Sequence, residues 1–140
     1  RKAIDDYKES REKFEANFDY YHEEIAKCTY RQFTTGFYYG KTDENSQIYD
    51  ANTYIKEYTY VGIVQKVDEQ GRCMIYQRNK FCVGDEIEVM IPDGTNETYT
   101  VKALYNEKGE SVESAPHPKQ EIWIDFGAPL KEGYLLRKQG

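Results

Sequence analysis

The sequence predicts a mainly β fold, in which a small antiparallel β-barrel of about six strands follows an N-terminal amphipathic α-helix. Ile87, Val89 and Ile91 fall on one face of the segment Glu86–Ile91, which is the two-residue period of a half-buried strand. Turn sequences that contain glycine and aspartate separate segments of this kind at short intervals. Residues 1–28 instead show the three-and-four spacing of a helix with one apolar face.

Length and charge limit the classes of function that the chain can serve. With 140 residues, of which 39% are hydrophobic, the chain can build one domain with a small core. Its formal net charge of −6 argues against tight, sequence-independent binding of RNA or DNA by this chain alone. A local basic patch is still compatible with that total, because Arg72, Arg78 and Lys80 lie close together in the sequence.

The cysteines and histidines give no sign of a metal centre. Three cysteines are present without any CxxC spacing, as expected for reduced residues of a cytoplasmic protein. The two histidines, His22 and His117, are far apart, so we expect no metal site and no cofactor in this chain. The sequence also lacks a secretory signal and any apolar run long enough to cross a membrane, and we expect no membrane partner.

The segment 1–28 is predicted to be a single amphipathic helix that runs to about Lys27. Its apolar stripe, interrupted at Arg11, consists of Ile4, Tyr7, Phe14, Phe18, Tyr21 and Ile25. We expect such a stripe to pack either on the barrel or on an upstream domain; alternatively, it forms a coiled-coil seam. The chain begins at Arg1 and enters this pattern at once, which fits the end of an upstream catalytic domain that the sequence does not include.

Residues 29–53 are predicted to form an aromatic loop followed by a polar linker. Gly36 and Gly40 bracket Phe37, Tyr38 and Tyr39, so the loop is expected to bend easily and to expose its rings. The rings then contact either a catalytic domain or a substrate; alternatively, they plug one end of the barrel. The polar composition from residue 41 to residue 52 indicates a surface connection.

Residues 54–140 are predicted to form the barrel. The first strand, 54–67, places Val61, Ile63, Gln65 and Val67 on one face, and a hairpin at residues 68–71 leads to a second strand in which Cys73 and Ile75 point inward and Met74 outward. Further strands are predicted at 86–91, 98–105, 120–126 and 134–138, with residues 110–119 as a loop. In the strand 98–105, Tyr99, Val101, Ala103 and Tyr105 share a face, as do Ile122, Ile124 and Phe126 later.

Several segments of the chain are similar to a known family. The runs YTYVGIVQKV (58–67), QRNKF (77–81), VGDEIE (83–88) and APHP (115–118) resemble the C-terminal domain of the collagenase-like peptidases of unassigned catalytic type, peptidase family U32. The run RQFTTGFYYG (31–40) resembles the segment that precedes this domain. The VGDEI turn is also similar to one in the second, barrel domain of translation elongation factors.

This resemblance implies that the chain is a non-catalytic accessory domain of a larger enzyme. Catalysis in the family belongs to an upstream, barrel-like domain with a cysteine cluster, which would be the partner of this chain. Some members are described as peptidases, and others take part in the hydroxylation of tRNA or ribosomal RNA bases with an iron–sulfur cluster. The substrate that the domain helps to bind would thus be protein or RNA; alternatively, the domain serves assembly alone and touches no substrate.

No catalytic residue is expected in the chain itself. The serines lack the sequence context of a nucleophile, and Glu86 and Glu88 are expected to solubilise the outer face of their strand. His117 lies between two prolines, either as a general base or as a rigid histidine that faces solvent.

The candidate substrate-binding residues are Arg78, Asn79 and Lys80, assisted by Arg72, Tyr38 and Tyr39. The QRNKF run breaks the strand alternation where a barrel strand ends, so its charged side chains can project from one rim. In the alternative interpretation, Asn79 makes a turn, Phe81 enters the core and the charges are merely solvated. Gly84 and Asp85 are expected to form a structural turn into the next strand.

Overall fold

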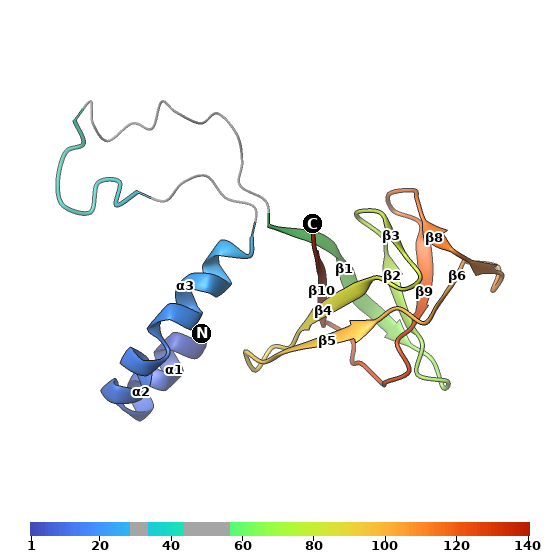
Figure 1. The fold of residues 1–140 in the computed structure, drawn as a ribbon, viewed down its shortest axis with the longest axis horizontal. Coiled ribbons are helices and arrows are strands. Elements are labelled where there is room, and N and C mark those ends of the chain that lie inside the picture. The colour runs from blue at the N-terminus through green and yellow to red at the C-terminus, as the bar shows by residue number, and fades with distance from the viewer. Residues whose placement is uncertain (29–33, 44–56) are drawn as a thin grey trace.

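The computed structural model describes residues 1–28, 34–43 and 57–140. A group of short helices at the N-terminus lies beside a curled β domain (Figure 1). The helices are α1 (Lys2–Glu9), α2 (Arg11–Ala16) and α3 (Phe18–Ala26). The strands are β1 (Tyr58–Val67), β2 (Cys73–Tyr76), β3 (Phe81–Cys82), β4 (Glu86–Met90), β5 (Asn96–Thr100), β6 (Ala103–Tyr105), β7 (Ser111–Val112), β8 (Ser114–Ala115), β9 (Glu121–Asp125) and β10 (Leu135–Gln139).

The main sheet curls into a half-barrel, which confirms the predicted mainly β, antiparallel fold. Its strand order is β5-β4-β10-β1-β2-β9-β6-β7, and every pairing is antiparallel. Strands β3 and β8 form a separate two-stranded sheet. The chain forms more and shorter strands than the six predicted, because it changes its pairing partners several times.

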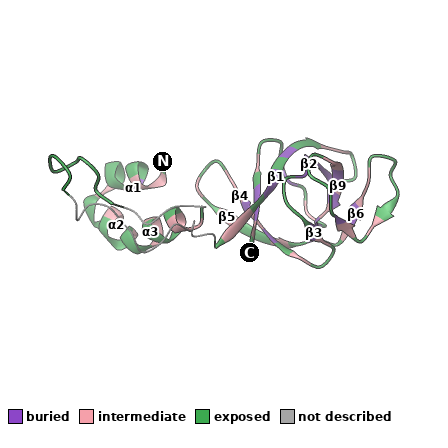
Figure 2. Ribbon diagram, turned by 90° about the horizontal axis from the view of Figure 1, so that it is seen from above, coloured by how far each residue is buried: buried purple, intermediate pink, exposed green. Residues whose placement is uncertain are grey.

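The hydrophobic core lies inside this curled sheet and takes its side chains from β strands and their connections (Figure 2). The inward residues predicted for β4 and β9, Ile87, Val89, Ile122 and Ile124, are fully buried, and Phe126 is nearly so. Cys73 and Ile75 are also fully buried, as predicted. The alternation of apolar residues therefore located the core face correctly in the regular strands.

The predicted alternation along β1 is wrong. Val61 is buried, but Ile63, predicted to share its face, is 36% exposed and Gln65 is exposed, whereas Val64 on the opposite predicted face is buried. The register of β1 shifts between Tyr60 and Gly62 and again between Val64 and Lys66. Each irregularity of this kind adds a residue to one strand and turns the following side chains to the other face.

Two further strand predictions need correction. Met74 was placed outside, but it is only 2% exposed and lies opposite Trp123 on the neighbouring strand β9. The predicted strand 98–105 is divided into β5 and β6, and Leu104 rather than Ala103 enters the core. The division occurs at Val101, whose N–H donates to the Asp85 carbonyl at 2.9 Å and whose carbonyl accepts from Gly84 N–H at 2.8 Å.

The segment 110–119, predicted as a loop, contains the two short strands β7 and β8. β7 continues the hairpin that starts with β6, and β8 pairs with β3 through Phe81 and Ala115. These strands are two residues long, which is too short to show any alternation in sequence.

The prediction of one continuous N-terminal helix is also wrong, because the helix breaks at Ser10. This residue is extended, with φ −160° and ψ 149°, and its Oγ accepts a hydrogen bond from the N–H of Lys13 at 3.0 Å. Serine is a favoured N-cap residue, so the side chain that ends α1 also starts α2. The helix α1 then folds back on α2 and α3, where Tyr7 meets Phe14 edge to face with their ring centres 5.5 Å apart.

A buried carboxylate stabilises this helical hairpin from inside. Asp6 is 4% exposed and accepts a hydrogen bond from the Tyr21 hydroxyl at 2.6 Å. Lys2 and Lys13 provide opposite charges at 3.6 and 3.5 Å. The Tyr21 hydrogen bond and these two cations outweigh the effect of burial and lower the pKa of Asp6, so the carboxylate stays ionised and continues to join the two arms.

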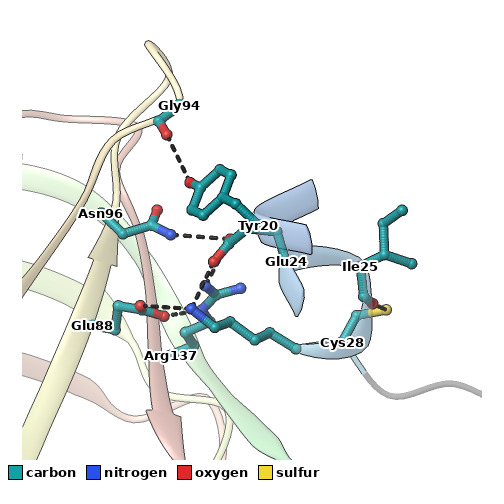
Figure 3. Close-up of polar contacts among 9 residues, drawn as sticks. Tyr20, Glu24, Ile25, Cys28, Glu88, Gly94, Asn96 and Arg137 are labelled. Carbon is teal, nitrogen blue, oxygen red and sulfur yellow. Dashed lines mark hydrogen bonds and ion pairs between the residues drawn. The ribbon is translucent and has the colours of Figure 1, made fainter. Parts of the chain in front are cut away.

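The helical hairpin meets the sheet through polar contacts centred on Arg137 (Figure 3). Arg137, on β10, is 7% exposed and pairs with Glu88 on β4 and, at 3.0 Å, with Glu24 on α3. Lys27 lies 2.6 Å from Glu24 and 3.4 Å from Glu88. The Tyr20 hydroxyl also donates to the Gly94 carbonyl at 3.2 Å. The expectation that Glu88 only solubilises the strand is therefore wrong.

The aromatic loop is described between residues 34 and 43. Phe37, Tyr38 and Tyr39 are 77%, 83% and 82% exposed, so the alternative in which these rings plug the barrel is wrong. The predicted linker and the start of the first strand at residue 54 lie mostly outside the described residues.

Replacing Gly84 with Val should destabilise the domain by about 1–3 kcal/mol, because Gly84 has a φ of +88° that a side chain tolerates poorly. No atom lies within 4 Å of an added Cβ, so the cost comes from the backbone alone. Thermal unfolding followed by circular dichroism should show a melting temperature several degrees lower. Gly84→Asn should lose less stability than Gly84→Val, since asparagine adopts a positive φ more readily. Equal melting temperatures for the wild type and both variants would refute the role of this turn.

Acid should loosen the hairpin from the sheet, because Glu24 must be ionised to hold Arg137 and Lys27. Burial alone would raise the pKa of Glu24, but hydrogen bonds from Lys27, Arg137 and Asn96 outweigh it and lower the pKa. A lowered pKa contributes stability above the unfolded value, about 4.3 for glutamate, and this contribution is lost as the pH falls through the folded value. Between pH 6 and pH 3, the melting temperature should thus fall more steeply for the wild type than for Glu24→Gln. Parallel plots of melting temperature against pH would contradict this role of Glu24.

Candidate substrate-binding rim

Three of the predicted binding residues, Arg78, Asn79 and Lys80, lie together and exposed on the connection from β2 to β3. The connection is fixed through its backbone and through Asn79. Arg78 N–H donates to the Val61 carbonyl at 2.9 Å, and the Asn79 amide donates to the Tyr60 carbonyl at 2.7 Å. Among the described residues, neither Arg78 nor Lys80 makes an ion pair, so both charges are available to a ligand.

A second loop brings two more basic side chains to the same end of the sheet. Because Phe81 pairs with Ala115, Lys80 and the loop that follows Ala115 are neighbours. Lys119 N–H then donates to the Gln77 carbonyl at 2.7 Å, immediately before Arg78. We refer to the exposed residues of the two loops as the basic rim, which consists of Arg78, Asn79, Lys80, His117 and Lys119.

His117 is a candidate from the sequence, whereas Lys119 is not. Nothing in the sequence pairs the two loops, since that contact depends on the two-residue strands β3 and β8. The backbone of Lys119 has a φ of 66°, which is uncommon for a residue with a side chain. The structure therefore adds Lys119 to the candidate site.

Gln77 is the buried residue that joins both loops of the rim. It is 0% exposed, and its side-chain amide donates to the carbonyls of Asn79, at 3.1 Å, and of Ala115. Its backbone bonds the other loop too, donating to the Gln120 carbonyl at 3.0 Å. Its Oε1 is buried and has no hydrogen-bond partner among the described residues.

Two exposed tyrosines lie on the strands near the basic rim. Tyr60 is 39% exposed, and its backbone carbonyl accepts the Asn79 hydrogen bond, but the residue also lines a depression on the side of the helices with Tyr58 and Arg137. Tyr76, next to Gln77 in sequence, is 47% exposed. Cationic side chains beside exposed aromatic rings are typical of surfaces that bind single-stranded nucleic acid, where rings stack on bases and cations meet phosphates.

Arg72 does not join the basic rim. It precedes β2, whereas Arg78 follows it, so the two residues are separated by roughly 20 Å of extended chain at ~3.3 Å per residue. Its guanidinium lies 2.7 Å from Asp68 and 5.1 Å from the centre of the Tyr105 ring. There it lines a separate depression of about 420 Å³ together with Tyr105 and Trp123.

The other predicted residues have the following places. Tyr38 and Tyr39 stack edge to face with their ring centres 5.0 Å apart, and no described ring contact or hydrogen bond links them to the rim. Gly84 and Asp85 form the turn from β3 to β4. Asp85 accepts hydrogen bonds from Cys82 N–H at 2.8 Å and Lys138 at 2.7 Å. Burial would raise the pKa of Asp85, but Lys138 and the Cys82 N–H outweigh it and lower the pKa.

The described residues show no catalytic or metal-binding cluster. Burial raises the pKa of the Cys73 thiol to about 11, so this sulfur is a poor nucleophile at neutral pH. Cys28 is exposed and Cys82 half-buried, and the three thiols lie on separate elements. No group of three or more potential metal ligands occurs in the described part of the chain. None of the described helices is long and apolar enough to cross a membrane.

The chain matches several known proteins. A family model for the peptidase family U32 C-terminal domain matches residues 56–137. The chain is 30% identical over 139 residues to "tRNA hydroxylation protein P1" of Bacillus subtilis, 32% identical over 138 residues to "tRNA hydroxylation protein P" of Haemophilus influenzae, and 28% identical over 115 residues to the protein of the same name in Escherichia coli.

These alignments include 99%, 97% and 81% of this chain but only 33%, 29% and 25% of the relatives. Among solved structures, the C-terminal domain of a protein described as a U32 peptidase from Geobacillus thermoleovorans superposes with a TM-score of 0.53 at 32% identity. That match covers 57% of this chain and 99% of the solved domain. The chain therefore belongs to peptidase family U32 and contains its C-terminal domain.

Proposed function

We propose that this chain is the non-catalytic C-terminal part of a cytoplasmic tRNA hydroxylation protein, and that its basic rim binds tRNA and orients it toward an upstream catalytic domain. Two supports are independent of each other. Three relatives that carry the name tRNA hydroxylation protein align with most of the chain. The rim itself gathers cations on two loops, both of which include segments that resemble the family's motifs.

The observation that carries the proposal is the presence of unpaired cations at one end of a chain that is otherwise acidic. Arg78, Lys80 and Lys119 are exposed and make no ion pair among the described residues. The net charge of −6 disfavours indiscriminate binding of phosphates by the chain as a whole, which favours contact with RNA at a local cluster of cations such as the rim. A small positive site on an acidic domain orients a bound nucleic acid rather than holding it indiscriminately.

Gln77 acts in this proposal as a positioning residue, because it is buried beneath the rim and hydrogen-bonds to both loops. The buried amide donates to one carbonyl in each loop, and the Gln77 backbone accepts from Lys119 N–H. The spacing of Arg78, Lys80 and Lys119 then depends on a residue that no ligand can touch. A phosphate backbone, which repeats at fixed intervals, is recognised best by cations that are held at fixed separations.

The hydroxylation itself requires residues that this chain does not supply. The iron–sulfur cluster that the family resemblance implies would belong to the upstream part, because the three cysteines of this chain are on separate elements. The chain's contribution is binding and orientation. A competing function, binding of a protein substrate by a peptidase, uses the same rim with acidic side chains in place of phosphates.

Changing Arg78 and Lys80 to Ala in the full-length protein should weaken tRNA binding by ~1 kcal/mol in total, as expected for two exposed ionic contacts. The dependence of log affinity on log salt should also become shallower by about two, one for each lost phosphate contact. Filter binding of tRNA and of a collagen-like peptide at two or more salt concentrations measures both effects. Lys108→Ala with Lys131→Ala, two exposed cations outside the rim, is the matched control.

Each result of that experiment decides between the alternatives. Loss of tRNA binding with peptide binding unchanged supports the proposal, whereas loss of peptide binding alone would assign the rim to a protein substrate. Affinities and salt slopes that match the wild type for both ligands would leave the rim without a substrate and overturn the proposal.

Gln77→Met should destabilise the domain by about 1–3 kcal/mol, because two carbonyls lose their buried donor. It should also weaken tRNA binding although Gln77 is inaccessible, with faster hydrogen exchange of the Arg78 and Lys80 amides. Gln65→Met, at an exposed glutamine of β1, is the control and should change neither quantity. A lower melting temperature with unaltered tRNA affinity would show that Gln77 serves folding alone.

A further inference from the structure

The helical hairpin is attached to the sheet by its polar side. Tyr20 and Glu24 on one stripe of α3 contact β10 and the β4–β5 turn (Figure 3), and Lys27, directly after α3, contacts β4. Amphipathic helices ordinarily pack on their own domain through the apolar side. In the described part of the chain, none of the three helices contributes a side chain to the hydrophobic core.

The apolar residues Phe18 and Ile25 of α3 lie off the stripe that binds the sheet, although Ile25 also borders a depression of about 310 Å³ that Met90 and Ile91 line from the sheet. At roughly 100° per residue, Phe18 and Ile25 project roughly 140–160° from the direction of Tyr20. Both are largely in water, with 48% and 52% of their surface exposed. Ile4 and Tyr7 on α1 are each 59% exposed.

We call these four exposed side chains of the hairpin the apolar hairpin face. Phe14 links two of them, because its ring centre lies 5.5 Å from that of Tyr7 and 5.8 Å from that of Phe18. Ile4 is one helical turn from Tyr7, and Ile25 is two turns from Phe18. The exposed ion pairs Arg1–Asp5 and Arg11–Glu15 belong to α1 and α2 of the same hairpin. Exposed apolar side chains gathered on one element, with charged groups around them, are the usual composition of a protein–protein contact.

We infer that the apolar hairpin face docks on the upstream part of the full-length protein, which precedes residue 1. The relatives named above extend well beyond the aligned region, since this chain accounts for 25–33% of their length. The matched domain is the C-terminal one of its family, so the additional length lies before it. The helix α1 begins at Lys2 and is therefore the first described element that such a segment would reach.

This docking would set the orientation of the basic rim relative to the catalytic part. The polar contacts around Arg137 fix the hairpin to the sheet, and the apolar hairpin face fixes the hairpin to the upstream part. The inference shares with the proposed function the premise of a longer parent protein, but it does not depend on RNA binding by the rim.

Hydrogen exchange measured by mass spectrometry, without tRNA, tests the inference on the full-length protein and on the 140-residue chain. Peptides from α1 and α3 should exchange at least about tenfold more slowly in the full-length protein, because docking suppresses local opening. Phe18→Ser with Ile25→Ser in the full-length protein should return α3 to the rate of the 140-residue chain. Val83→Ser, at a 42% exposed apolar residue of the β domain, should leave the protection intact.

A second variant separates docking from folding of the hairpin. Ile25→Lys removes no ring contact and adds a charge to the apolar hairpin face, so helix content of the 140-residue chain should be unchanged while protection in the full-length protein is lost. Equal exchange rates of α1 and α3 in the two wild-type proteins would overturn the inference. So would concentration-dependent dimerisation of the 140-residue chain that Ile25→Lys abolishes, since the face would then bind a second copy.

Loss of protection in Ile25→Lys, together with normal tRNA binding by its rim, would support the docking inference and the proposed function separately. If α1 and α3 are protected from hydrogen exchange in the full-length protein, but changing Arg78 and Lys80 to Ala leaves the tRNA affinity unchanged, docking would be supported and tRNA binding by the rim refuted.

Discussion

A single guanidinium determines how the two parts of this chain are arranged. Arg137 lies almost completely inside the protein, where an unpaired charge would be very unfavourable. Glu88 faces it across the sheet as its register partner, and Glu24 reaches it from α3. Burial alone would lower the pKa of Arg137, but hydrogen bonds to the two carboxylates outweigh it and raise the pKa. Because hydrogen bonds have directions, this contact holds α3 at a defined place on the sheet, which an apolar contact would not do.

The predictable part of the fold is the part in which local pattern and final pairing agree. β4 and β9 alternate in sequence and each has a regular antiparallel neighbour, so their buried faces were correctly assigned. The buried face of β1 was predicted wrongly because its two register shifts arise from its pairing with β10 and β2 and leave no pattern in the sequence of β1 itself. Ser10 carried a usable signal, since a serine N-cap interrupts a helix locally. The apolar spacing on either side of Ser10 hid that signal, because the two helices contact each other through the same residues.

The candidate site divides in the same way. Arg78 and Lys80 could be predicted because a break in strand alternation next to charged residues indicates an exposed connection. Arg72 could not be excluded from the site by sequence alone, because it is only six residues from Arg78. The extended strand β2 between them, which separates the two side chains, is known only from the structure. Lys119 and Gln77 required the pairing of β3 with β8, and a fully buried glutamine inside a run of exposed polar residues has no signature in sequence.

The contact around Arg137 also brings the end of α3 close to the start of β1. The guanidinium lies 4.9 Å from the centre of the Tyr58 ring, and Lys27, at the end of α3, lies 5.6 Å from the same ring. Lys27 and Tyr58, on either side of the interval between α3 and β1, are thus held close together. For a loop whose ends are held together, the entropy of closure grows only with the logarithm of length, about 0.6 kcal/mol for each doubling. A change in the number of residues between Lys27 and Tyr58 should therefore cost the rest of the molecule little stability.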